Sequence, residues 1–92
     1  MAKNVRVLIV EDHDMARMGL SVVLGNNDKI EVVGMSADGQ DGVDKALELI
    51  PDVVIMDIGL PTIDGIEATK RIKSQNTKIK VLMYTSREDE DD

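Results

Sequence analysis

The sequence contains no cysteine, and Tyr84 is its only aromatic residue. The absence of cysteine excludes both a disulfide framework and a thiolate zinc site. No apolar run approaches the roughly 18 residues needed to span a bilayer, and the N-terminus lacks the apolar core of a signal peptide. We therefore expect a soluble, cytoplasmic protein that does not contact a membrane, with a core of aliphatic side chains and methionine.

An excess of basic charge is also missing. The 92 residues carry 11 basic and 18 acidic side chains, a formal net charge of −7. Much of that charge comes from the acidic run at 88–92, so the rest of the chain is nearly balanced. This balance does not suggest nucleic-acid binding by this chain alone. The length allows one small domain, and the 42% hydrophobic content is that of a folded protein.

What the sequence does contain is a regular alternation of two patterns. Short, mostly apolar runs predict β-strands at Val5–Val10, Ile30–Met35, Val53–Asp57 and Lys80–Tyr84. Segments with helical spacing of apolar residues lie between them and begin near Asp14, Asp38 and Asp64. The first is expected to pack through Ala16, Gly19, Leu20, Val23 and Leu24, with Met15 and Met18 also in helix packing. Such alternation predicts right-handed crossovers and a parallel sheet with helices on both faces.

Three of the predicted strands are followed or ended by polar groups: Glu11 and Asp12, then Asp57, then Thr85 and Ser86. The carboxyl ends of parallel strands share one edge of the sheet, where ligands bind. If the first and third strands are neighbours, Asp12 and Asp57 converge, and such a pair needs a raised pKa or a cation. For a single acid, helix capping explains its position equally well, whereas three converging ends favour a site.

A cluster that offers only oxygen ligands suits Mg²⁺, and the Gly59 carbonyl could add another ligand. A carboxylate beside Mg²⁺ can attack phosphorus. His13, the only histidine, adjoins the acidic pair. We expect it to be a partly exposed residue with a raised pKa rather than a metal ligand or proton shuttle.

These motifs resemble the receiver domain of bacterial two-component response regulators, most of all the NarL/FixJ (LuxR-like) type. The resemblance rests on the segments 7–13, 46–52, 53–61, 64–69 and 81–85. It implies a flavodoxin/CheY-like α/β fold, a doubly wound parallel sheet that is incomplete, with four strands in the order 2-1-3-4 and about three helices. Residues 1–87 would form the N-terminal (βα)3β portion of the receiver domain. The acidic end at 88–92 would begin a fourth helix or be disordered.

The resemblance also implies a role for each polar residue at the sheet edge. Asp57 would be the phosphoacceptor for a sensor histidine kinase, with Mg²⁺ as cofactor. Asp12, Asp57 and the Gly59 carbonyl would bind the ion, Glu11 would act through water, and Thr85 would be the switch hydroxyl. Transcriptional control through DNA would belong to an output domain outside this chain.

The sequence departs from this family after the fourth strand. The family's fifth strand, its aromatic switch residue and the lysine that pairs with the phosphoryl group have no counterpart in it. A fourth strand at the sheet edge predicts self-association or a domain-swapped dimer. Two alternatives stay open: an interaction module that works without phosphorylation, and a Mg²⁺-dependent phosphatase. The phosphatase is disfavoured because Gly59 stands where such enzymes carry a second carboxylate.

Overall fold

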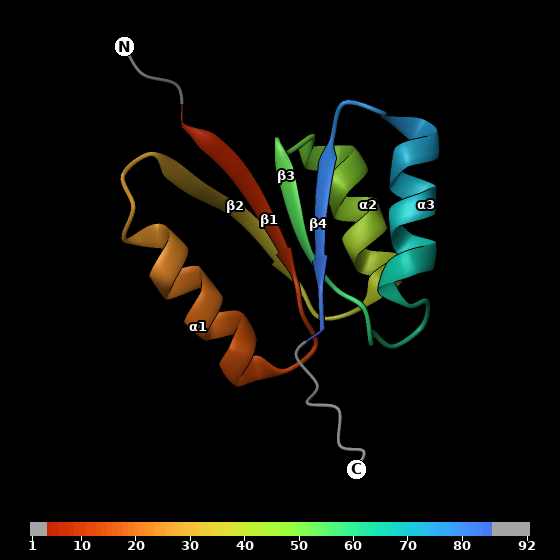
Figure 1. Cartoon of the computed structure of the whole chain (residues 1–92), viewed down its shortest axis with the longest axis horizontal. Helices are drawn as coiled ribbons and strands as arrows, with labels where there is room; N and C mark the ends of the chain where they lie inside the picture. The colour runs from red at the N-terminus through yellow and green to blue at the C-terminus, as the bar shows by residue number, and fades with distance from the viewer. Residues whose placement is uncertain (1–3, 86–92) are drawn as a thin grey trace.

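The structure, a computed structural model, describes residues 4–85. Its elements follow the predicted alternation: β1 (Val5–Val10), α1 (Asp14–Gly25), β2 (Ile30–Ser36), α2 (Gly39–Leu49), β3 (Val53–Asp57), α3 (Gly65–Gln75) and β4 (Lys80–Tyr84). The four strands form one parallel sheet in the order β2-β1-β3-β4 (Figure 1). The predicted fold class and strand order are therefore confirmed. The acidic end at 88–92 lies outside the described residues.

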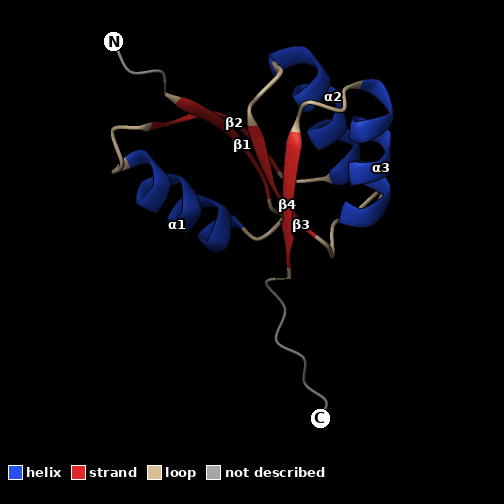
Figure 2. Cartoon of the chain, turned by 45° about the horizontal axis from the view of Figure 1, so that its top comes forward, coloured by secondary structure: helices blue, strands red, loops and turns tan. Residues whose placement is uncertain are grey.

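The helices form layers on the two faces of the sheet. Helix α1 covers one face, and α2 and α3 lie together on the other (Figure 2). The core fills the space between the sheet and the α2/α3 layer, because alternate residues of each strand point toward it. Its strand residues include Leu8, Val10, Val54 and Met56, and its helix residues include Val43, Ala46, Ala68 and Ile72.

Helices α2 and α3 begin where the sequence predicts, because each has an aspartate as its N-cap. The Asp38 carboxylate accepts a hydrogen bond from the Asp41 backbone N–H at 2.7 Å, and Asp64 accepts one from the Glu67 N–H at 2.9 Å. Each bond satisfies a donor that the first helical turn leaves unpaired. Helix α1 differs, since its N-cap is His13 and no side-chain bond caps it.

Helix α1 has no buried residue, and its predicted apolar face is only partly correct. Ala16, Leu20 and Leu24 are partly buried, as expected. Helix α1 packs mainly against β1 and β2, so a narrow stripe of the helix contacts the sheet. The expectation of packing is wrong for four residues, which are exposed: Met15, Met18, Gly19 and Val23.

The carboxyl ends of β1, β3 and β4 meet at one edge of the sheet, the lower edge in Figure 1. Val10 of β1 pairs in register with Met56 of β3, and Asp57 of β3 pairs in register with Tyr84 of β4. Glu11, which directly follows β1, therefore comes level with Asp57 and Tyr84. Across residues 4–85, none of the helices combines the length and the apolar character that a membrane crossing requires.

Candidate functional site

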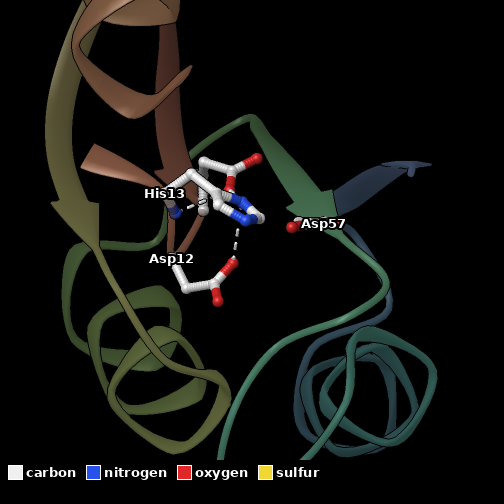
Figure 3. Close-up of side chains that lie close together, drawn as sticks. Asp12, His13 and Asp57 are labelled. Carbon is white, nitrogen blue, oxygen red and sulfur yellow. Dashed lines mark hydrogen bonds and ion pairs between the residues drawn. The ribbon is translucent and has the colours of Figure 1, made fainter. Parts of the chain in front are cut away.

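Three carboxylates and one imidazole gather at this edge of the sheet. One ligand atom from each of Glu11, Asp12, His13 and Asp57 lies within 4.8 Å of the others. Figure 3 shows Asp12 and His13, which follow β1, facing Asp57 at the end of β3. The predicted convergence of Asp12 and Asp57 is therefore confirmed. It follows from the sheet order, in which β1 and β3 are adjacent.

Asp57 is the last residue of β3, at the carboxyl edge of the sheet, and is almost completely buried, with 2% of its surface exposed. Its Oδ1 accepts a hydrogen bond from the Gly59 N–H at 3.3 Å. The Ile58 backbone N–H donates a hydrogen bond to the Tyr84 carbonyl at 2.9 Å, which fixes the turn after Asp57 against β4. These bonds place the Asp57 carboxylate among the other acids.

Glu11 is fully buried, yet both of its carboxylate oxygens have donors. Its Oε2 accepts a hydrogen bond from the His13 backbone N–H at 2.8 Å and lies 2.9 Å from His13 Nδ1. Its Oε1 accepts a hydrogen bond from the Tyr84 hydroxyl. Burial alone would raise the pKa of Glu11, but the hydrogen bonds from Tyr84 and His13 outweigh it and lower that pKa. Glu11 is therefore a buried, ionised carboxylate at neutral pH.

His13 is exposed, and its ring faces two of the acids. Besides Glu11, its Nδ1 lies 3.4 Å from Asp12 Oδ1 (Figure 3). The hydrogen bond with Glu11, followed by the negative charge of Asp12, raises the pKa of His13. The exposure and raised pKa expected from the sequence are both confirmed.

Asp12 supplies the observation that points to a ligand. Its Oδ1 is buried and, alone among buried side-chain oxygens and nitrogens of residues 4–85, has no hydrogen-bond partner. The oxygen pairs with the His13 ring at 3.4 Å but accepts no hydrogen bond. A buried carboxylate oxygen that accepts no hydrogen bond is costly, and a hard cation would satisfy it. The donor set of carboxylate oxygens therefore fits Mg²⁺, with Asp12 and Asp57 facing the same space.

The remaining predicted site residues lie at the same edge. Gly59 is exposed in the loop after β3, and Thr85 is exposed directly after β4. The metal-ligand role of the Gly59 carbonyl and the switch role of the Thr85 hydroxyl stay predictions. Sequence reasoning missed Tyr84 as a member of the site. The available signal was the placement of the sole aromatic residue directly before Thr85 at a strand end.

Comparison with known proteins places this site in a family. Residues 7–92 match the family model of the response regulator receiver domain. The chain is 46% identical over 87 residues to the transcriptional regulatory protein LiaR of Bacillus subtilis, covering 95% of this chain and 41% of LiaR. It is 48% identical over 82 residues to the response regulator protein VraR of Staphylococcus epidermidis, covering 89% of this chain and 39% of VraR. The chain belongs to the response regulator receiver domain family.

Solved structures agree with this assignment. The signal receiver domain of the putative response regulator NarL from Mycobacterium tuberculosis superposes with a TM-score of 0.88 and 26% identity, over 95% of this chain and 70% of that one. A CheX–CheY–BeF3–Mg²⁺ complex from Borrelia burgdorferi gives a TM-score of 0.83 and 26% identity, over 89% of this chain and 62% of that one. The match to a NarL-type receiver confirms the predicted subtype. The chain spans about two fifths of the length of LiaR and VraR.

Proposed function

We propose that Asp57 accepts a phosphoryl group from a sensor histidine kinase, with Mg²⁺ as the required cation. The observation that carries this proposal is the meeting of three carboxylates at the carboxyl edge of the sheet, one of which, Asp12, has a buried oxygen that accepts no hydrogen bond. Membership of the receiver family supports the role of phosphoacceptor in two-component signalling.

The transfer uses Asp57 as a nucleophile. One of its carboxylate oxygens forms a bond to phosphorus while the bond from phosphorus to the kinase imidazole nitrogen breaks. The imidazole retains the electron pair and takes up a proton from solvent. The Gly59 N–H, which donates to Asp57 Oδ1, orients the carboxylate for this attack. The Asp57 carboxylate faces Asp12 and His13 (Figure 3).

Asp12 and Asp57 are the residues that would hold Mg²⁺ directly, together with the Gly59 carbonyl, while Glu11 would act through water. A bound Mg²⁺ offsets the negative charges of the carboxylate and of the incoming phosphoryl group. The CheX–CheY complex, which contains BeF3 and Mg²⁺, supports this assignment. Thr85, at the same edge, would contact the phosphoryl oxygens as the switch hydroxyl.

The phosphorylated domain would control a transcriptional output domain in the full-length protein. LiaR is a transcriptional regulatory protein, and a similar structure is that of the response regulator RcsB in complex with DNA. Both support an output domain that binds DNA. We place this function in the cytoplasm, as predicted from the sequence. The chain would act as a phosphoacceptor that assists its own phosphorylation, not as a hydrolytic enzyme.

Acetyl phosphate with Mg²⁺ provides a direct test, read by intact-mass measurement. The wild type should gain the mass of one phosphoryl group, whereas Asp57→Asn should gain none. Asp28→Asn, which makes the same change at an exposed aspartate after α1, should label as the wild type does. Equal labelling of the wild type and Asp57→Asn would rule out Asp57 as the acceptor.

A second proposal concerns self-association through β4. Within residues 4–85 this strand is the last of the sheet, and Leu82 and Met83 are 61% and 41% exposed. Edge strands with exposed apolar residues pair with other chains, and a lysine on the edge prevents it. Light scattering should therefore detect a dimer of the wild type at high concentration and a monomer of Leu82→Lys. A monomeric wild type under these conditions would contradict this proposal.

A further inference from the structure

Tyr84 connects two strands that are not neighbours. Its hydroxyl, on the last residue of β4, donates a hydrogen bond to Glu11, which directly follows β1. Strand β3 lies between β1 and β4 in the sheet. Tyr84 is the register partner of Asp57, and paired residues of neighbouring strands point to the same face. The tyrosine side chain therefore passes the phosphoacceptor position to reach Glu11.

Glu11 depends on this contact because it is fully buried. The His13 N–H and Nδ1 contact Oε2, and the Tyr84 hydroxyl donates a hydrogen bond to Oε1. Removing the hydroxyl would leave a buried carboxylate oxygen without its donor, which is costly for an ionised group. The acid would then no longer be held in this position and could rotate toward the neighbouring carboxylates. That rotation would change the geometry that the acidic cluster presents to a cation.

We propose that Tyr84 is a positioning residue of the acidic site, and that its hydroxyl holds the Glu11 carboxylate in place for Mg²⁺ binding. Protein donors hold both Glu11 oxygens in place, so Glu11 contributes its negative charge from a fixed position, while Asp12 and Asp57 are the proposed direct ligands. This inference rests on the proposed phosphoacceptor function and assigns a role within it to a side chain outside the ligand set.

The same contact anchors the end of β4. Thr85, the residue with the predicted switch role, directly follows Tyr84 in the chain. The Tyr84 carbonyl also accepts a hydrogen bond from the Ile58 N–H at 2.9 Å, in the turn after Asp57. Tyr84 therefore ties the strand that carries Thr85 to both the Glu11 strand and the Asp57 turn.

The test compares the wild type with Tyr84→Phe, which keeps the ring and removes only the hydroxyl. The rate of labelling by acetyl phosphate is measured over a range of Mg²⁺ concentrations. The half-saturating Mg²⁺ concentration should rise about tenfold, the lower end of the range for groups that orient metal ligands. The limiting rate at saturating Mg²⁺ should stay near that of the wild type. Met83→Leu, at the neighbouring residue on the opposite face of β4, should leave both quantities unchanged.

A double-mutant comparison separates positioning from general support of the fold. In a Glu11→Gln background, Tyr84→Phe should cause no further rise in half-saturating Mg²⁺, because the group that it positions has already lost its charge. Equal and additive effects in the two backgrounds would overturn the inference. A half-saturating concentration of Mg²⁺ unchanged by Tyr84→Phe alone would also overturn it.

Tyrosine fluorescence tests the contact between Tyr84 and Glu11 without changing Tyr84 itself. Tyr84 is the only aromatic residue, so the emission comes from this side chain alone. A carboxylate acceptor quenches tyrosine emission by accepting the phenol proton in the excited state, so Mg²⁺-free Glu11→Gln should emit more strongly than the wild type. Equal emission from the two proteins would contradict the contact. A wild type that neither labels nor responds to Mg²⁺ would instead refute the proposed function, and the role of Tyr84 with it.

Discussion

Gly65, the first residue of α3, lies directly against the backbone of Asp57. A Cβ at position 65 would overlap the Asp57 carbonyl oxygen and would come within 2.9 Å of the Ile58 Cα. The Gly65 N–H donates to the Ile58 carbonyl at 2.8 Å, so the two segments are also bonded. The loop after the phosphoacceptor strand therefore closes onto the strand end only because residue 65 has no side chain.

Gly65→Ala should destabilise the protein and disturb the site. The overlapping atoms belong to the backbone and cannot move aside as the end of a flexible side chain could. Overpacking of this kind costs about 1–3 kcal/mol, and urea unfolding should show a loss at or above the upper end of that range. Gly19→Ala is the matched control, because nothing lies within 4 Å of a Cβ at that helical position. It should increase stability by about 0.5–1 kcal/mol; a loss comparable to that of Gly65→Ala would contradict the explanation.

The titration of His13 should report its contact with Glu11. Its pKa is raised above the ordinary value of 6.5, first by the hydrogen bond to Glu11 and then by the charge of Asp12. A raised pKa in the folded state means that protonated His13 stabilises the fold. This contribution is complete below pH 6.5 and is lost as the pH rises through the folded-state pKa.

NMR of this single histidine, in Mg²⁺-free buffer, should give a pKa above 6.5 that falls toward the ordinary value in Glu11→Gln. An unchanged pKa in Glu11→Gln would show that Glu11 does not cause the shift.

Ile50 is a β-branched residue in the left-handed region, with φ 50° and ψ 62°, at the C-cap of α2. That conformation costs roughly 1–2 kcal/mol for most L-residues, and asparagine tolerates it better. The backbone contacts, such as the Arg6 Nη1 bond to the Ile50 carbonyl at 2.8 Å, do not depend on the side chain. Ile50→Asn should therefore raise the free energy of unfolding by about 0.5–1 kcal/mol.

The control for Ile50→Asn is the same change at Ile66, in the right-handed helix α3. The two isoleucines are 48% and 47% exposed, so they lose similar apolar contact. Ile66→Asn relieves no backbone strain and lowers helix propensity, so it should destabilise the protein. Both variants are measured by urea unfolding. A loss of equal size in both would mean that the conformation of residue 50 contributes little.

Much of the fold could be predicted because its signals are local. The apolar runs of β1 and β3 and the N-caps Asp38 and Asp64 act within a few residues of the chain. The face that α1 turns to the sheet could not be predicted in full, because the contacts of Gly19 and Val23 depend on which strands the helix covers. The helical spacing of apolar residues is the same whether a neighbour is present or not.

The candidate site also has one part that could be predicted from the sequence and one part that could not. Convergence of Asp12 and Asp57 follows from strand ends and from the pairing of β1 with β3, which the predicted topology contains. The Tyr84–Glu11 bond joins residues 73 positions apart and crosses an intervening strand. No local pattern encodes it, since it depends on the sheet order, the register of β4 and the reach of one side chain.

Removal of Mg²⁺ should test the role of the Asp12 oxygen that accepts no hydrogen bond. A ligand that binds only the folded state stabilises it in proportion to the logarithm of its concentration over Kd, about 2.7 kcal/mol at 100 times Kd. The melting temperature of the wild type should rise with added Mg²⁺ and return to its starting value with EDTA. Asp12→Asn removes the charge that faces the ion, so most of this rise should disappear. Asp28→Asn makes the same change in net charge away from the cluster and should keep the full rise. Loss of the rise in both variants would mean that Mg²⁺ acts through overall charge rather than through the Asp12 carboxylate.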